Sequence, residues 1–191
     1  MSTSVKICGL TDVNTALQAA ELGADFLGVV LTQSRRQISL TQAEDMLTAL
    51  LGIPVVGVGK DMDEPLFERL LELPFWGIQV HGHPPEDWVE RAHRYGKRAL
   101  ATWLDPKADV VLLDGPEPGS GRPRDWERPI WDRPLWIAGG LTPENVQSMV
   151  RDLSPDGVDV SSGVEVDGAK SLDRIARFIE EVRRGDNEKR T

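Results

Sequence analysis

Residues 135–163 have the sequence LWIAGGLTPENVQSMVRDLSPDGVDVSSG, in which a helical pattern separates two short apolar runs. The runs Leu135–Ala138 and Gly157–Val160 have the length and composition of buried strands. Between them, apolar side chains recur at the spacing of one helix face, at Val146, Met149, Val150 and Leu153. This order of strand, helix and strand is typical of a βαβ unit, whose two strands are parallel.

The same alternation continues through the rest of the chain. It predicts eight strands, at Val5–Cys8, Phe26–Leu31, Val55–Val58, Gly77–Val80, Ala99–Leu104, Val110–Leu113, Leu135–Ala138 and Gly157–Val160. Helix starts are predicted by a capping box of Thr41 with Glu44, and by Thr142 as an N-cap before Pro143. Eight strands in a chain of 191 residues favour a closed barrel over a doubly wound sheet.

The chain is short for such a barrel, which ordinarily takes about 250 residues. Only Asp105-Pro106-Lys107-Ala108-Asp109 separates the fifth expected strand from the sixth. A parallel crossover usually needs about a dozen residues, so we expect the fifth helix to be reduced to a loop. The sequence therefore predicts a single, shortened (β/α)8 TIM barrel of the α/β class over residues 1–184. We expect residues 185–191, which mix both charges, to form a flexible tail.

Composition restricts the partners and the compartment. The net charge of -9 and the lack of a basic run before the tail argue against a nucleic-acid partner. Apolar runs fall far short of the ~20 residues of a membrane span, so no membrane partner is expected. The single cysteine excludes an intramolecular disulfide, and the N-terminus lacks a signal-peptide pattern. We expect a protein of the reducing cytoplasm.

Glycines follow the last two expected strands, where a barrel commonly binds phosphate. Gly139 and Gly140 follow the seventh strand, and Ser162-Gly163 follows the eighth. Glycine lets backbone N–H groups approach an anion closely, and a helix N-terminus adds partial positive charge. This placement predicts a phosphate site, to which Gly119 and Gly121 in the loop after the sixth strand would add donors. The alternative is that the glycines only relieve tight turns.

Two residues at strand ends are candidates for proton transfer. Cys8 ends the first strand, and an unpaired cysteine is usually a small buried hydrophobe. As a base it would need a lowered pKa, and Lys6 on the same strand face would favour the thiolate. Asp114 follows an apolar run, where a carboxylate suits an acid, or else caps a loop or pairs with Arg122 or Arg124. The residues alone leave both roles open.

Other charged and ligating side chains give weaker signals. Arg35 and Arg36, in the loop after the second strand, would suit a bidentate clamp on a carboxylate, although solvated surface charge is the usual alternative. His81 and His83 are two residues apart, but no third ligand lies nearby in the sequence. We therefore expect no metal site.

Six segments at the expected strand ends occur in a fixed order along the chain. They are Lys6–Thr11, Gly23–Asp25 with Ser34–Ser39, Gln79–Gly82, Leu112–Asp114, Ala138–Val146 and Val158–Glu165. Together they resemble the motifs of the phosphoribosylanthranilate isomerase family. The resemblance runs from about residue 4 to about residue 182, and six motifs in order are far more specific than one.

The resemblance implies a cofactor-free Amadori rearrangement in tryptophan biosynthesis. The substrate would be N-(5-phosphoribosyl)anthranilate and the product 1-(2-carboxyphenylamino)-1-deoxyribulose 5-phosphate, made by a monomer or homodimer. By this resemblance Asp114 is the acid that protonates the ring oxygen, and Cys8 is the base that takes the proton from C2. Arg36 faces the anthranilate carboxylate. The resemblance also implies substrate contacts from Gln79, His81 and Asp159, and a phosphate site at Gly119, Gly121, Gly139, Gly140, Ser162 and Gly163.

The sequence departs from the family pattern in several loops. Pro118 begins the loop that usually has two glycines there, and Arg124 replaces an apolar residue. Gly59-Lys60-Asp61 is unlike the usual Phe-Val-Asn, and His83 stands where an acidic residue is common.

The sequence also allows other functions for a phosphate-binding barrel. An indole-glycerol-phosphate synthase would need a catalytic lysine on a strand, where Lys6 is the only candidate, and a sugar-phosphate epimerase typically has metal-binding histidines. A non-catalytic barrel that acts as a binding module is the alternative from another class, because a fold does not fix an activity.

Overall fold

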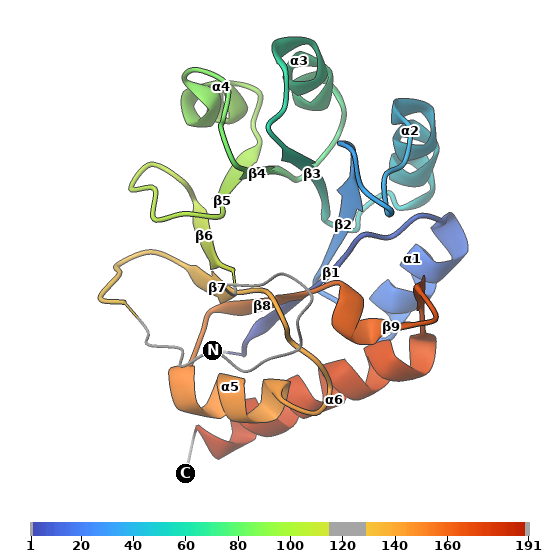
Figure 1. Ribbon diagram of the computed structural model, residues 1–191, viewed down its shortest axis with the longest axis vertical. Helices are drawn as coiled ribbons and strands as arrows, with labels where there is room; N and C mark the ends of the chain where they lie inside the picture. The colour runs from blue at the N-terminus through green and yellow to red at the C-terminus, as the bar shows by residue number, and fades with distance from the viewer. Residues whose placement is uncertain (1, 115–128, 190–191) are drawn as a thin grey trace.

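The computed structural model describes residues 2–114 and 129–189. Eight parallel strands follow one another around a closed barrel (Figure 1). They are β1 Ser4–Cys8, β2 Phe26–Val30, β3 Val55–Lys60, β4 Gly77–His81, β5 Arg98–Ala101, β6 Val110–Leu113, β7 Leu135–Ile137 and β8 Gly157–Val160. The predicted (β/α)8 barrel is confirmed.

Helices lie outside the barrel and bury their apolar faces against it (Figure 1). They are α1 Val13–Glu21, α2 Leu40–Ala49, α3 Glu64–Glu72, α4 Trp88–Arg94, α5 Val146–Leu153 and α6 Leu172–Glu188. The described residues 102–109, between β5 and β6, contain no helix, as the short connection predicted. Among residues 2–114 and 129–189, no helix has the length and apolarity that a bilayer crossing requires.

The fifth strand is shorter than its apolar run suggested. β5 ends at Ala101 instead of Leu104, and the chain bends at the next two residues. The ring of Trp103 packs against Trp88 of α4, with 6.0 Å between ring centroids. This aromatic contact partly buries Trp103 outside the barrel, whereas Leu104 is exposed, so the apolar run extends beyond the strand.

The two predicted helix starts are shifted. The capping box of α2 is formed by Ser39 and Gln42, because the Ser39 side chain accepts from the Gln42 N–H and the Gln42 side chain accepts from the Ser39 N–H. The predicted box of Thr41 with Glu44 is therefore wrong by two residues. Thr142 caps a turn that precedes α5, whose first helical residue is Val146.

The inside of the barrel is filled at the N-terminal ends of its strands by three aromatic rings. The Phe26 ring centroid lies 4.6 Å from that of Trp76 and 5.0 Å from that of Trp136. A Cβ added to Gly157 would lie 2.6 Å from the Trp136 ring, so only glycine leaves room for this indole. With this end closed by side chains, a ligand has to enter at the C-terminal ends of the strands.

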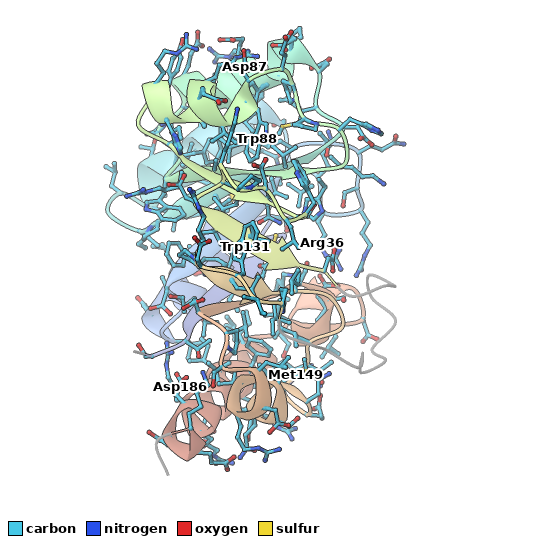
Figure 2. The ribbon with its side chains drawn as sticks, turned by 90° about the vertical axis from the view of Figure 1, so that its left-hand side faces the viewer. Arg36, Asp87, Trp88, Trp131, Met149 and Asp186 are labelled. Atoms are coloured by element: carbon cyan, nitrogen blue, oxygen red, sulfur yellow. The ribbon has the colours of Figure 1, made fainter. Side chains whose placement is uncertain are left out.

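The C-terminal residues are helical where composition predicted flexibility. α6 continues through Glu188, and Asp186 lies on it (Figure 2). The Asp186 carboxylate accepts hydrogen bonds from the N–H and the hydroxyl of Thr3, at 2.8 and 2.6 Å. Gly185 packs against Val150 of α5. The prediction of a flexible tail from residue 185 is therefore wrong for residues 185–188. This helix end is bonded to Thr3, the residue that precedes β1.

Candidate active site

A cavity of about 650 Å³ opens at the C-terminal ends of the strands. Ten of the twelve residues predicted for the site line it: Cys8, Arg36, Gln79, His81, Asp114, Gly139, Gly140, Asp159, Ser162 and Gly163. The other two, Gly119 and Gly121, lie outside the described residues, as do Arg122 and Arg124. The fold thus brings together candidates that come from six different strand ends.

A buried ion pair lies beneath the cavity, inside the barrel. Lys6 is fully buried, and its Nζ donates to Asp159 Oδ1 at 2.9 Å. Burial opposes the ammonium charge, but the charges of Asp159 and Cys8 outweigh it and raise the pKa of Lys6. Gly28 of β2 leaves the space for this arrangement, because a Cβ there would lie 2.9 Å from Cys8 Sγ and 3.0 Å from Lys6 Nζ.

The pKa of Cys8 is set by burial and by two neighbouring charges. Lys6 does lie beside the thiol and favours the thiolate. Burial of Cys8, however, is the larger effect, and with help from the Asp159 carboxylate it raises the pKa of the thiol. The predicted influence of Lys6 is present, but the lowered pKa that a base was said to need is not, because burial disfavours the thiolate more than Lys6 stabilises it.

Gln79 and His81 point from β4 into the same cavity as a bonded pair. Their Nε2 atoms lie 2.8 Å apart. Burial and the nearby Lys6 charge lower the pKa of His81 to about 4, so the imidazole is neutral at neutral pH and accepts from the Gln79 amide. Gln79 Oε1 is buried and has no partner among the described residues. It is an unused acceptor in the cavity wall.

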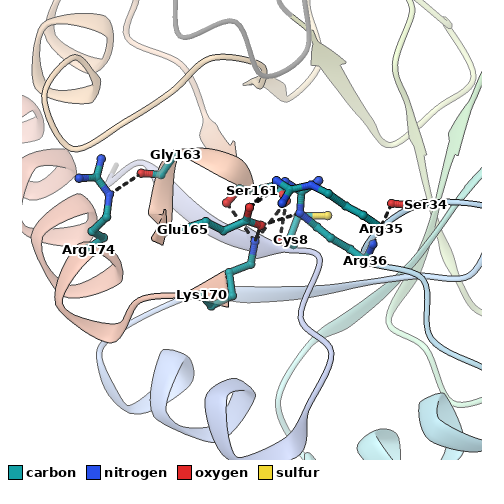
Figure 3. Close-up of polar contacts among 9 residues, drawn as sticks. All are labelled: Cys8, Ser34, Arg35, Arg36, Ser161, Gly163, Glu165, Lys170 and Arg174. Atoms are coloured by element: carbon teal, nitrogen blue, oxygen red, sulfur yellow. Dashed lines mark hydrogen bonds and ion pairs between the residues drawn. The ribbon is translucent and has the colours of Figure 1, made fainter. Parts of the chain in front are cut away.

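Arg36 reaches a carboxylate of the protein itself. Its Nε and Nη2 donate to the two oxygens of Glu165, at 2.5 and 3.0 Å (Figure 3). Lys170 donates to the same carboxylate at 2.8 Å, and Arg35 does so at 2.5 Å. Burial opposes the negative charge, but Arg36 and Lys170 hold the pKa of Glu165 at about 2. Sequence reasoning assigned no role to Glu165 or Lys170, although Glu165 ends the last of the six motifs.

The glycine loops after β7 and β8 touch each other at the cavity wall. Gly139 and Gly140 have φ angles of 78° and 68°, a region that L side chains rarely adopt. A Cβ on Gly163 would lie 1.8 Å from the Leu141 carbonyl oxygen, so the two backbones meet without a side chain between them. Arg174 Nε donates to the Gly163 carbonyl at 3.0 Å, which fixes this loop (Figure 3). The glycines therefore do relieve tight turns, and they do so in the wall of the cavity.

Comparison with known proteins assigns the chain to a family. The sequence model of the family described as N-(5'phosphoribosyl)anthranilate (PRA) isomerase matches residues 5–181. The chain belongs to this family. An N-(5'-phosphoribosyl)anthranilate isomerase of Streptococcus mutans is 39% identical over 197 residues, which cover 95% of this chain and all of the relative.

Solved structures of the PRA isomerase family have the same fold. The enzyme from Thermus thermophilus superposes with a TM-score of 0.79 at 33% identity, over 95% of this chain and 98% of the other. A second structure is of phosphoribosyl anthranilate isomerase in complex with reduced 1-(o-carboxyphenylamino)-1-deoxyribulose 5-phosphate. It superposes with a TM-score of 0.73 at 28% identity, again over 95% and 98% of the two chains.

Asp61 and His83, which both depart from the PRA isomerase pattern, are bonded to each other. Asp61 accepts from the His83 N–H at 2.8 Å, and its carboxylate lies 3.2 Å from His83 Nδ1. Gly59 leaves the space that Met62 fills, since a Cβ there would lie 2.4 Å from the methionine side chain.

Across residues 2–114 and 129–189, no group of three His, Cys, Asp or Glu side chains is placed to hold a metal.

Proposed function

We propose that this protein is a phosphoribosylanthranilate isomerase of tryptophan biosynthesis. It converts N-(5-phosphoribosyl)anthranilate into 1-(2-carboxyphenylamino)-1-deoxyribulose 5-phosphate. The observation that carries the proposal is the joint lining of one cavity by Cys8, Asp114, Arg36 and the glycine loops. The reaction needs an acid, a base, a carboxylate site and a phosphate site, and these residues supply each of them.

Asp114 starts the rearrangement as the general acid. It donates a proton to the ring oxygen while the C1–O bond breaks, and the nitrogen lone pair forms the C1=N bond of a protonated Schiff base. The cationic nitrogen makes the C2–H bond acidic. Each proton transfer of this kind is worth about 10²–10⁴-fold in rate.

Cys8 then acts as the general base. The thiolate takes the proton from C2, the electrons of the C–H bond form C1=C2, and the electrons of the C=N bond return to nitrogen. The resulting enolamine becomes the ketone when C1 gains a proton and the C2 hydroxyl loses one. Only protons and bonding electrons move within one molecule, so the balance of the reaction requires no redox cofactor.

The raised pKa of Cys8 has two opposite effects on this step. Less thiolate is present at neutral pH, but the thiolate that forms is a stronger base toward carbon acids. Burial sets the direction of the pKa shift, and Lys6 and Asp159, which lie beside the thiol with opposite charges, adjust its size. A base thiol must also stay reduced, which favours the cytoplasm as the working compartment.

The remaining predicted residues bind the substrate. The unpartnered oxygen of Gln79 accepts a hydrogen bond from a sugar hydroxyl, and neutral His81 holds the Gln79 amide in place. Asp159 keeps Lys6 charged and in position beneath the sugar. Backbone donors at Gly139, Gly140, Ser162 and Gly163 hold the phosphate. A contribution from Gly119 and Gly121, a monomeric or homodimeric state, and the lack of nucleic-acid or membrane partners stay predictions.

Turnover of phosphoribosylanthranilate, followed by the fluorescence of the anthranilate adduct, tests the function. We expect activity from the wild type and a loss of about 10²–10⁴-fold in Cys8→Ala and in Asp114→Asn. Asp45→Asn is the matched control, because the exposed Asp45 on α2 lies away from the cavity. A folded wild type without turnover would instead favour the phosphate-binding module.

A further inference from the structure

Glu165 is the centre of a charge cluster beside the cavity. It begins the short strand β9 (Glu165–Val166), which pairs with β10 (Ala169–Lys170) in a two-stranded sheet outside the barrel. Three cationic side chains donate to its carboxylate, from Arg35, Arg36 and Lys170 (Figure 3). The Glu165 side chain is only 6% exposed, and that of Lys170 is 7% exposed. This is a buried, multiply bonded group and not a loose surface ion pair.

The cluster is anchored to the end of β1, where Cys8 lies. Lys170 Nζ donates to the Ser161 carbonyl at 2.9 Å and lies 3.2 Å from the Ser161 hydroxyl. The Ser161 hydroxyl donates to the Cys8 carbonyl at 3.0 Å. Glu165 is therefore held by Lys170 in a fixed position relative to the base.

The aliphatic part of the Arg36 side chain packs against the backbone of Gly9, and its guanidinium binds Glu165. A Cβ on Gly9 would lie 2.3 Å from Arg36 Cδ, so the aliphatic stem of Arg36 crosses directly over Gly9. The φ angle of 74° at Gly9 also favours glycine. The stem and the guanidinium are thus both restrained, by Gly9 and by Glu165, before any ligand arrives.

Glu165 occupies only one edge of the guanidinium. It accepts from Nε and Nη2, and a guanidinium presents five N–H donors in a planar fork. Within residues 2–114 and 129–189, no hydrogen bond reaches the edge formed by Nη1 and the second hydrogen of Nη2, and Arg36 lines the cavity. Three cations around one carboxylate also leave two positive charges in excess. Glu165 orients the arginine without cancelling its attraction for an anion.

We propose that Glu165 is a positioning residue that turns the free edge of Arg36 toward the carboxylate of the substrate. The inference rests on the proposed function, since it takes the arylamine carboxylate to be the group that Arg36 binds. It assigns to Glu165 and Lys170 the selectivity for a carboxylated arylamine over an arylamine without a carboxylate. Neither residue contacts the reacting atoms.

Two stable ligands separate this role from a merely structural one. One is reduced 1-(o-carboxyphenylamino)-1-deoxyribulose 5-phosphate, and the other is its phenylamino counterpart without the carboxylate. Calorimetry gives the Kd of each ligand for the wild type, for Glu165→Gln and for Glu72→Gln. Glu72 is the matched control, because it is an exposed residue of α3 whose ion pair with Arg69 lies outside the cavity.

We expect Glu165→Gln to bind the carboxylated ligand about tenfold more weakly, the cost of ordering one long side chain on binding. Binding of the ligand without a carboxylate should change less than about twofold. In turnover, KM should rise by the same factor of about ten while kcat stays within about threefold, because Cys8 and Asp114 are unchanged. The double variant Glu165→Gln/Lys170→Met removes the buried pair together and should lose the same selectivity, which covers the case that Lys170 without its partner unfolds the single variant.

Three results would overturn the inference. Equal weakening of both ligands would mean that Glu165 only supports the loop. Tighter binding of the carboxylated ligand would mean that Glu165 competes with the substrate for Arg36. Unchanged affinity for both ligands would remove any role in binding. A wild type that binds both ligands but does not turn over phosphoribosylanthranilate would refute the proposed function alone, so the two failures are distinguishable.

Discussion

Replacing Lys6 by methionine tests whether the buried ammonium controls the basicity of Cys8. An added Cβ at Gly28 would lie 2.9 Å from Cys8 Sγ and 3.0 Å from Lys6 Nζ, so these two atoms are within about 6 Å of each other. At an effective dielectric constant of about 20, unit charges at this separation attract by about 3 kcal/mol. That energy corresponds to a factor of about 100 in the ionisation constant of the thiol.

The variant should therefore hold less thiolate at every pH below the pKa of Cys8. Loss of the ammonium raises the pKa of the thiol, and the Asp159 carboxylate left behind acts in the same direction. Reaction with iodoacetamide reports this directly, because Cys8 is the only cysteine in the chain. A thiolate of higher pKa is also more nucleophilic, which recovers about half of the loss on a logarithmic scale. We expect alkylation at neutral pH to slow about tenfold and its pH midpoint to rise.

Asp159→Asn provides the control of opposite sign. Its carboxylate raises the pKa of Cys8, so its removal should lower the pH midpoint of alkylation. The double variant Lys6→Met/Asp159→Asn removes both charges and avoids a buried unpaired carboxylate. A midpoint in Lys6→Met that is unchanged or lower than in the wild type would refute the assignment of Lys6 as the group that favours the thiolate.

Three further predictions concern the loops, the helix end and the pH profile. Gly163→Ala forces a Cβ onto the Leu141 carbonyl and should cost about 1–3 kcal/mol in urea unfolding, with weaker inhibition by inorganic phosphate. Asp186→Ala leaves the Thr3 N–H without its acceptor and the Thr3 hydroxyl with only the longer bond to the Pro155 carbonyl, and should cost about 1–3 kcal/mol in the same measurement. An unchanged stability would instead support the flexible tail. The bonds from Thr3 and Lys189 lower the pKa of Asp186 against the effect of burial, so this stabilisation is present above the pKa of the unfolded chain and is lost as pH falls through the folded pKa. His81, with a pKa of about 4, is neutral from pH 5 upward, so kcat/KM of His81→Gln should keep the shape of the wild-type profile between pH 5 and 8 even if its magnitude falls.

The architecture could be predicted from local sequence patterns, because the barrel repeats one unit of a strand and a helix. The apolar runs at Val110–Leu113 and Gly157–Val160 have the same bounds as the observed strands β6 and β8. The missing fifth helix was predictable from the length of one connection, since five residues are too few for a crossover helix. Each of these features depends on residues that are neighbours in the sequence.

The errors arose where a distant contact or competing local signals decide the structure. Ser39 and Thr41 both precede a Glu or Gln by three residues, and the structure uses the first of these two overlapping boxes. Asp186 is fixed by Thr3, which is 183 residues away, so composition could not show that the helix end is held. The sequence placed Lys6 beside Cys8 correctly, but the sign of the pKa shift depends on how deeply the barrel buries the thiol.

The distribution of charge explains how a protein with a net charge of -9 receives an anionic substrate. The surface as a whole repels a phosphorylated carboxylate, so attraction has to come from the cavity itself. Lys6 and Asp159 cancel each other beneath the sugar, where an unpaired charge would disturb the proton transfers. Arg35, Arg36 and Lys170 carry an excess of positive charge around Glu165, and Lys60 adds another cation to the cavity lining. Recognition of the carboxylate thus depends on how the Glu165 cluster directs its charge and not on how much charge the protein carries.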